Sequence, residues 1–188
     1  MDPNKKSSIR QQVKLQKSLL DDKIKNFAAN AVFSKIENSL WFKNAYHILT
    51  YSSLPDELQS TQYLNQWKNA KSIYLPRVNQ NILEILPAAQ TSLGAFNINE
   101  PIGNNIISTS ILQLIIVPGI AFDTNGTRIG RGKGFYDRLL NSTNALKIGV
   151  GYDFQLFDSI PSECHDVPMD AIITPSNTII INKSIPWQ

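Results

Sequence analysis

Residues 112–119 read Leu-Gln-Leu-Ile-Ile-Val-Pro-Gly, an apolar run that is interrupted only by Gln113 and ends at a proline and a glycine. Strands with one solvent-facing side alternate apolar and polar residues, whereas strands of a parallel sheet are covered on both faces and are apolar almost throughout. The run therefore predicts a central strand over residues 112–117. Because loops at the carboxyl ends of such strands bind ligands in α/β sheets, we expect the segment after Gly119 to have a functional role.

Helical patterns flank this strand on both sides. Apolar residues recur at intervals of three and four over residues 7–40. A break at residues 20–22, which includes an aspartate suited to capping, predicts two helices, the second beginning near Lys23. We expect a further helix from Asp56, acting as its cap, to about residue 69, and another over residues 135–140.

Short apolar or β-branched runs predict the other strands. They lie at residues 47–51, 72–75, 82–86, 148–152, 171–174 and 178–181. Two of them are expected to stop at Pro76 and Pro87, because proline cannot donate a ladder hydrogen bond. The alternation of strands and helices predicts an α/β fold of three layers, α/β/α, with a largely parallel, Rossmann-like sheet in a single domain over residues 1–188.

Residues 92–110 interrupt this alternation. They contain Gly94, Pro101 and Gly103 among many asparagines, and they follow neither the helical nor the strand period. We expect an extended loop or lid in this region.

The composition narrows the classes of function. The 188 residues are 42% apolar, which is enough for one compact core, and the formal charge of +3 is too small for a nucleic-acid coat. The single cysteine, Cys164, excludes an internal disulfide, and the presence of only His47 and His165 excludes a Cys/His zinc cluster. Without a signal-peptide core or a membrane-spanning run, we expect a cytoplasmic monomer that binds neither membranes nor nucleic acid.

The segment with the most candidate functional residues is residues 128–138, Arg-Ile-Gly-Arg-Gly-Lys-Gly-Phe-Tyr-Asp-Arg. Its four cations and three alternating glycines suit an anion-binding loop, because glycine lets the backbone approach a phosphate closely and a following helix adds amide donors. The pattern is neither a P-loop nor a dinucleotide fingerprint, since Gly134 follows Lys133 and Phe135 stands where a third glycine is needed. Taken alone, it also fits a surface turn with solvated charges.

Longer stretches of the sequence favour the anion-binding loop over the surface turn. Residues 116–123, Ile-Val-Pro-Gly-Ile-Ala-Phe-Asp, together with the glycine segment, resemble the signature of the 5-formyltetrahydrofolate cyclo-ligase family. Supporting matches cover nearly the whole chain and lie at residues 6–10, 74–78, 100–101, 148–152 and 165–170. The chain departs from the family at Phe135, where a tyrosine is common, and at Asn97, where a glycine often stands.

The resemblance implies a reaction. It is the conversion of 5-formyltetrahydrofolate, with or without a polyglutamate tail, and MgATP to 5,10-methenyltetrahydrofolate, ADP and phosphate. The formyl oxygen would attack the γ-phosphate, and N10 would then close the ring as phosphate leaves. Such a reaction needs positioning and charge neutralisation rather than a covalent nucleophile, so we expect Cys164 and His165 to be structural.

The resemblance also implies which residues form the site. Arg131 and Lys133 would be catalytic, with Lys133 stabilising charge on the formyl oxygen and the γ-phosphate. The expected ATP contacts are Lys6, Arg10, Arg128, Gly130, Arg131, Gly132, Lys133, Gly134, Phe135 and Tyr136. The expected substrate contacts are Glu57, Arg131, Gly132, Lys133, Gly134 and Phe135. Asp137 and Asp170 match the family positions for Mg²⁺, a hard ion that prefers oxygen ligands.

Other interpretations of these residues stay open at this point. Lys6 and Arg10 stand four apart and share one helix face, which also suits a plain solvated surface. A sugar-phosphate isomerase or an acyl-CoA transferase-like enzyme would share the α/β architecture but would need no ATP. A nucleic-acid-binding or protein-binding module would use the basic loop as an electrostatic patch, and its binding to RNA would depend steeply on salt.

Overall fold

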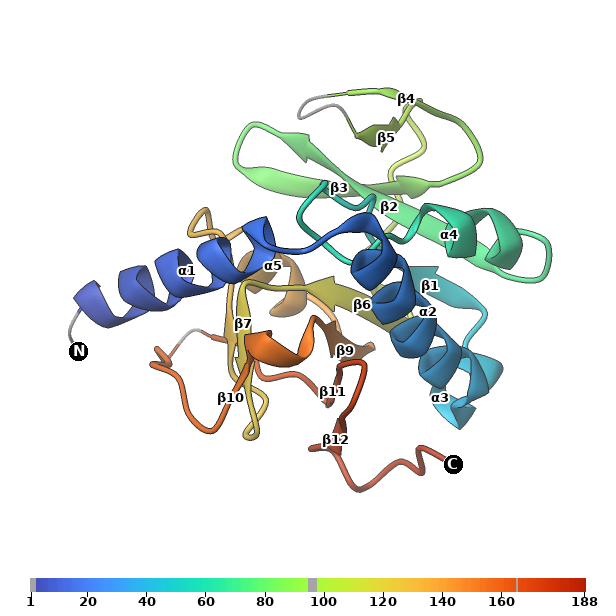
Figure 1. Ribbon diagram of the computed structural model, residues 1–188. Coiled ribbons are helices and arrows are strands. Elements are labelled where there is room, and N and C mark those ends of the chain that lie inside the picture. Colours follow the sequence, from blue (N-terminus) through green and yellow to red (C-terminus); the bar gives the residue numbers. More distant parts are fainter. Residues whose placement is uncertain (1–2, 95–97, 165) are drawn as a thin grey trace.

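The computed structural model describes residues 3–94, 98–164 and 166–188, and Asn97 and His165 lie outside these ranges (Figure 1). Seven strands of the described chain form one sheet in the order β12-β11-β9-β6-β1-β2-β3. The strands are β1 (His47–Leu49), β2 (Ser72–Asn79), β3 (Ile82–Pro87), β6 (Leu114–Pro118), β9 (Leu146–Val150), β11 (Ala171–Ile173) and β12 (Thr178–Ile180). The apolar run of residues 112–117 thus supplies β6, the middle strand of the sheet, as predicted.

The interior of this sheet is parallel. Strand β6 pairs in parallel with β1 on one side and with β9 on the other, and the parallel pairing continues outward to β2 and β11. Only the outer strands β3 and β12 run antiparallel to their neighbours. The predicted α/β fold with a largely parallel sheet is therefore confirmed.

Helices cover both faces of the sheet. They are α1 (Pro3–Ser18), α2 (Asp22–Asn38), α3 (Leu40–Asn44), α4 (Thr61–Trp67) and α5 (Phe135–Leu140). Alternate residues of β6 face opposite sides: Ile116 packs in a cluster with α2, α3 and α4, whereas Ile115 packs in a cluster with α5. This arrangement explains why β6 is apolar at successive positions. None of the helices in the described ranges is long and apolar enough to cross a membrane.

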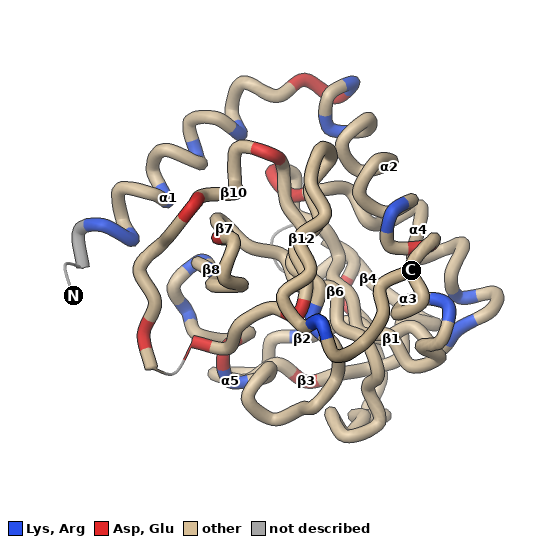
Figure 2. The backbone as a smooth tube through the Cα atoms, turned by 90° about the horizontal axis from the view of Figure 1, so that it is seen from below, with Lys and Arg blue, Asp and Glu red and all other residues tan. Residues whose placement is uncertain are grey.

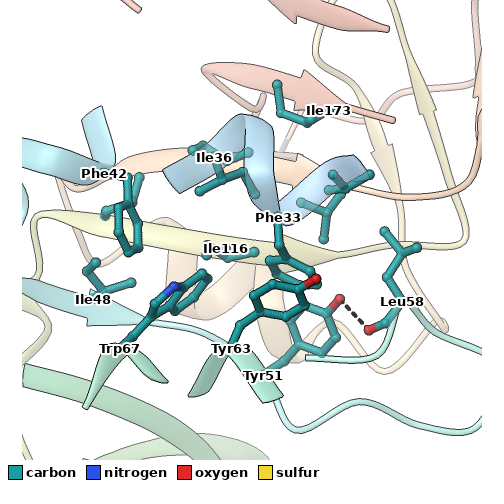
Figure 3. Packing of buried hydrophobic residues seen from close by; sticks show 14 of the residues in the cluster. Phe33, Ile36, Phe42, Ile48, Tyr51, Leu58, Tyr63, Trp67, Ile116 and Ile173 are labelled. Carbon is teal, nitrogen blue, oxygen red and sulfur yellow. Dashed lines mark hydrogen bonds between the residues drawn. The ribbon is translucent and has the colours of Figure 1, made fainter. Parts of the chain in front are cut away.

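Aromatic side chains pack in the cluster between the sheet and helices α2, α3 and α4 (Figure 3). The rings of Phe33 and Tyr63 stack with centroids 4.3 Å apart, and Trp67 meets Phe33 edge to face. The hydroxyl of Tyr51 donates to the carbonyl of Leu58 at 2.9 Å, so the loop after β1 is fastened to the core beneath it. The rigid core thus supports the loop that contains Asp56 and Glu57.

The two N-terminal helices are as predicted. Asp21 caps α2 by accepting a hydrogen bond from the backbone N–H of Ile24 at 2.8 Å. Ile9 and Val13 bury one face of α1 against a small three-stranded sheet, β10-β7-β8. The strands of that sheet are β7 (Ala121–Asp123), β8 (Arg128–Ile129) and β10 (Leu156–Phe157). These three strands were not predicted; β8 and β10 have only two residues each, which is too short to show a period.

Three predicted elements differ from the structure. Asp56 does not begin a helix: α4 begins at Thr61, and the carboxylate of Asp56 instead contacts Lys17 and Arg131. Strand β2 continues through Pro76, because β1 pairs only as far as Tyr74 and the proline N faces no partner strand there.

The third difference is in residues 92–110, which are not a plain loop. Strands β4 (Thr91–Leu93) and β5 (Asn99–Pro101) pair antiparallel, and a 3-10 turn spans Thr109–Ile111. Polar residues dominate both strands, so their composition hid the pairing.

A tight contact inside the sheet gives a test of this packing. A β-carbon added at Gly149 of β9 would lie 2.6 Å from Cε1 of Phe122, a fully buried ring. We therefore expect Gly149→Ala to lower the free energy of unfolding by ~1–3 kcal/mol, measured by urea denaturation. The double variant with Phe122→Leu should be more stable than the sum of the two single losses predicts, because the smaller side chain makes room for the added β-carbon. Unchanged stability in Gly149→Ala would contradict the packing described.

Candidate functional site

The site begins at a change of direction in the chain. After β1 the chain crosses to β2 on one side, and after β6 it crosses to β9 on the other. The loops that follow β1 and β6 therefore separate at the carboxyl ends of the two strands. Ligands of open α/β sheets bind at such points. The two loops hold Glu57 and the glycine loop of residues 130–134, respectively.

The glycine loop joins β8 to α5 and needs its glycines. Gly132 has φ +95° and Gly134, the residue before α5, has φ +64°, both in the region that side chains disfavour. A β-carbon at Gly134 would also lie 2.8 Å from Nη1 of Arg138. Arg138 in turn donates to the carbonyl of Lys133 at 3.1 Å and to that of Asn81 at 2.6 Å, which braces the loop against the β2–β3 hairpin. The side chain of Lys133 is exposed.

Helix α1 lies beside this loop and presents Lys6 and Arg10 on one face. Arg10 donates from Nε to the carbonyl of Gly130 at 3.0 Å. Lys6, one turn earlier, reaches the carboxylates of Glu163 at 2.8 Å and Asp166 at 3.2 Å. Figure 2 shows acidic positions in red on the segment that follows β10, on the same side of the molecule as α1.

Electrostatics keep Lys6 charged in this position. Burial acts to lower the pKa of Lys6, but the hydrogen bonds and charges of Glu163 and Asp166 outweigh it, so the pKa lies above its ordinary value. The ammonium group is therefore fully protonated at neutral pH and is available for an anion that displaces or joins its carboxylate partners.

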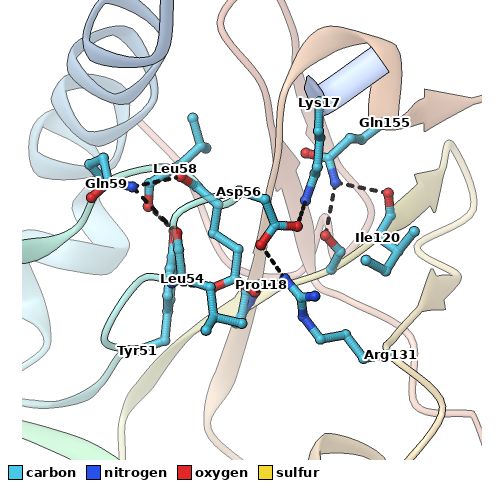
Figure 4. Close-up of polar contacts among 12 residues, drawn as sticks. Lys17, Tyr51, Leu54, Asp56, Leu58, Gln59, Pro118, Ile120, Arg131 and Gln155 are labelled. Atoms are coloured by element: carbon cyan, nitrogen blue, oxygen red, sulfur yellow. Dashed lines mark hydrogen bonds and ion pairs between the residues drawn. The ribbon is translucent and has the colours of Figure 1, made fainter. Parts of the chain in front are cut away.

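Arg131 of the glycine loop lies in a second charged cluster, which includes Asp56 and Lys17 (Figure 4). Its Nη2 contacts Oδ1 of Asp56 at 2.6 Å and Oε1 of Glu57 at 3.2 Å. The other oxygen of Asp56 accepts from Nζ of Lys17 at 3.3 Å, and the other oxygen of Glu57 accepts from the backbone N–H of Leu54 at 3.1 Å. Both carboxylates are thus held in place before any ligand is considered.

The charged groups in this cluster shift one another's pKa values. Burial alone would raise the pKa of Asp56, but the charge of Lys17 and the hydrogen bond of Arg131 hold that pKa below its ordinary value. Burial lowers the pKa of Lys17, and Asp56 and Glu57 oppose this only in part. Burial, with Asp56 and Glu57 close by, raises the pKa of Tyr152 to about 12, so its hydroxyl remains a donor at neutral pH.

Arg128, which is buried, pairs with the partly exposed Asp137 beside the glycine loop. The two side chains meet at 2.6 Å, and the Arg128 side chain is 4% exposed. Arg128 also donates to the carbonyl of Pro118 at 3.4 Å and lies over the ring of Tyr136, while its Nε has no partner among the described residues. Phe135 is covered by the guanidinium of Arg138. Both aromatic rings therefore already have neighbours within the protein.

Asp137 and Asp170 are not brought together. Asp137 reaches Arg128 near the carboxyl end of β6, whereas Asp170 precedes β11 and lies level with Lys147, near the amino end of β9. The carboxylate of Asp170 accepts from the backbone N–H of Lys147 at 2.8 Å and from Asn182 at 2.9 Å. Within residues 3–94, 98–164 and 166–188, no group of three or more metal-binding side chains is close enough to hold an ion. As a pair, these two aspartates do not fit a shared Mg²⁺ site.

Several residues near the site were missed in the sequence. Asp166 and Glu163 contact Lys6. Asp166 lies in the family match over residues 165–170, but it was given no role there, and no motif includes Glu163. Lys17 could have been found, because the helical spacing of Lys6 and Arg10 continues through Val13 to position 17. Asp56 was noticed only as a helix cap.

Comparisons with known proteins agree with this architecture. The sequence profile of the 5-formyltetrahydrofolate cyclo-ligase family matches residues 2–175. The chain is 32% identical to 5-formyltetrahydrofolate cyclo-ligase of Escherichia coli K12 over 144 residues, which cover 70% of this chain and 79% of that protein. It is 30% identical to the Haemophilus influenzae protein of the same name over 186 residues, 92% of this chain and 99% of the relative.

Solved structures show the same fold. The NMR structure of 5,10-methenyltetrahydrofolate synthetase from Aquifex aeolicus superposes with a TM-score of 0.87 at 30% identity, covering 97% of this chain and 96% of that one. A synthetase of the same name from Mycoplasma pneumoniae, at 20% identity, superposes with a TM-score of 0.77 over 94% of this chain and 100% of that one, which supports the fold alone. The profile match over almost the full length and the two relatives of at least 30% identity show that this chain belongs to the 5-formyltetrahydrofolate cyclo-ligase family.

Proposed function

We propose that this protein cyclises 5-formyltetrahydrofolate to 5,10-methenyltetrahydrofolate with ATP, releasing ADP and phosphate. Family membership supports the proposal, and one structural observation supports it most: the glycine loop contacts Arg10 of α1 through the carbonyl of Gly130 and Glu57 of the loop after β1 through Arg131. The loop therefore has cations for a polyphosphate and, next to them, a carboxylate for a heterocycle with N–H donors. All of these residues come from one chain, so the proposal requires no second copy.

The phosphate side of the site is the loop and the cations of α1. We assign the triphosphate to the backbone of Gly130, Gly132 and Gly134, with Lys6 and Arg10 contributing charge. Glycine permits close approach of an anion to the loop, and arginine and lysine add charge-assisted hydrogen bonds. Helix α5 has only six residues, so the loop and these side chains must provide most of the attraction.

The folate side of the site is Glu57 with Arg131. The carboxylate of Glu57 is held by Leu54 and Arg131, and it can accept from the N–H donors on the amino-pyrimidinone edge of the pterin. The formyl oxygen then lies toward the glycine loop. In this arrangement Arg131 and Lys133 come from the same short loop and can stabilise charge where the two substrates meet.

The reaction proceeds in two steps. The formyl oxygen attacks the γ-phosphorus, the bond from phosphorus to the bridging oxygen breaks, and ADP leaves. N10 then attacks the formyl carbon, its proton is lost, and the carbon–oxygen bond breaks to release phosphate. The protein positions the two substrates and neutralises charge at the transferring group through Lys133 and Arg131. We assign no step to Mg²⁺, because Asp137 and Asp170 do not fit a shared site.

The first test follows the absorbance of methenyltetrahydrofolate with and without MgATP. The wild type should show a rise that requires ATP, and Lys133→Ala should reduce kcat/KM by about ten- to a hundredfold, the loss expected for one charge-assisted contact. Lys23→Ala, an exposed lysine on α2, is the matched control and should behave as wild type. No ATP-dependent product from the wild type would refute the proposed function.

The glycine loop is tested with a pair of glycines. Alanine at Gly132, φ +95°, or at Gly103, φ +110°, is strained, and each substitution should lower the free energy of unfolding by ~1–3 kcal/mol. Only Gly132→Ala should also reduce kcat/KM, by at least about tenfold, because it displaces groups that bind the phosphates. Equal activity in the two variants would show that residues 130–134 do not bind the nucleotide.

The role of Asp170 is tested by its asparagine variant. Because its carboxylate accepts hydrogen bonds from Lys147 and Asn182, Asp170→Asn should lower the free energy of unfolding by ~1–3 kcal/mol in thermal melts. The Mg²⁺ concentration that gives half the maximal rate should stay as in the wild type. Asp22→Asn, at an exposed aspartate, is the control. A large increase in the Mg²⁺ requirement of Asp170→Asn would restore Asp170 as a metal ligand.

A further inference from the structure

Helix α1 presents a third cation to the site. Lys6, Arg10, Val13 and Lys17 are spaced by four, three and four residues, so they form one stripe along the helix. The first two cations lie at the glycine loop and its acidic neighbours, and the third is in the last turn of α1. Unlike most lysines, Lys17 is buried: its side chain is 4% exposed. A charge is tolerated there only because it is paired, and the partner is Asp56.

Asp56 divides its two oxygens between two cations. Oδ2 contacts Lys17 at 3.3 Å, and Oδ1 contacts Nη2 of Arg131 at 2.6 Å. The contact with Glu57 also uses Nη2, so among the described residues no hydrogen bond holds Nη1 or Nε of Arg131. The guanidinium is therefore fixed by one nitrogen and keeps its remaining N–H donors for a ligand, which matters because a guanidinium binds anions through paired donors.

Removal of Lys17 would change the balance of charge around Arg131. With Lys17 present, two cations face two carboxylates, and Lys17 competes with Arg131 for Asp56, contacting Oδ2 while Arg131 contacts Oδ1. Without Lys17, the cluster has an excess negative charge, and both oxygens of Asp56 can engage Arg131 in the stronger bidentate pair. The donors that Arg131 needs for its substrates would then be occupied within the protein.

We propose that Lys17 is a positioning residue for the reaction, which acts through Asp56 to keep Arg131 held at a single nitrogen and ready to bind. The inference rests on the proposed function, because it takes Arg131 to contact the transferring phosphoryl group. Lys17 itself touches neither substrate, so its effect should depend wholly on Asp56.

The test is Lys17→Met, with Lys14→Met, an exposed lysine of the same helix, as its matched control. In the ATP-dependent assay, Lys17→Met should reduce kcat by about tenfold with a smaller change in the KM for ATP, because a transition-state contact is lost. Lys14→Met should match the wild type. Lys17→Arg retains the charge and should recover most of kcat, which a purely structural role for the side chain would not predict.

A double-mutant cycle separates positioning from general damage. Asp56→Asn should reduce kcat as Lys17→Met does, and the double variant should be no slower than Asp56→Asn alone, because Lys17 acts through Asp56. Additive losses, or a Lys17→Met enzyme as fast as Lys14→Met, would overturn the inference. If Lys17→Met does not fold, Asp56→Asn, at a side chain 40% exposed, decides alone: unchanged kcat would refute the inference. An inactive wild type would instead refute the proposed function.

Discussion

The parallel pairing of β1 with β6 is the constraint on which the rest of the structure depends. Only two residue pairs define it, Ile48 with Leu114 and Leu49 with Ile115, yet all four residues are completely buried. Since each strand must connect to a parallel neighbour on its other side, the two outgoing loops separate. The position of the candidate site follows from this topology, and its chemistry depends on which residues the two loops place there.

The small sheet β10-β7-β8 determines which helix lies beside the glycine loop. Ile120 and Ile129 form an apolar surface that Ile9 and Val13 of α1 cover. Because helical neighbours three and four residues apart share a face, the residues next to this apolar stripe reach the loop together. Burial of two aliphatic side chains therefore brings Arg10 to the carbonyl of Gly130 and Lys17 to Asp56. The hydrophobic contact of α1 and its charged contacts depend on each other.

Prediction from sequence succeeded where one period dominates and failed where tertiary contacts decide. The run at residues 112–117 identified the central strand, and the spacing before Asp21 identified two helices, because burial imposes those periods on the sequence. Asp56 carries no such mark: an aspartate after a proline suits a helix cap, and only the approach of Lys17 and Arg131 makes it part of a charged cluster. Asp170 lies in a recognisable motif, but the register of β11 with β9 places it away from Asp137.

The charges of the site also indicate what kind of ligand it accepts. Lys6 is paired with Glu163 and Asp166, Arg131 with Asp56 and Glu57, and Arg128 with Asp137. An anion alone would draw cations away from these carboxylates, and the less exposed ones, such as Glu57 and Asp166 at 11%, would lose charged partners that water replaces only in part. A polyphosphate bound together with a donor-rich heterocycle satisfies both sets at once, the cations through its oxygens and the carboxylates through the N–H groups of the ring. The balance of charge thus favours two substrates bound side by side over either one alone.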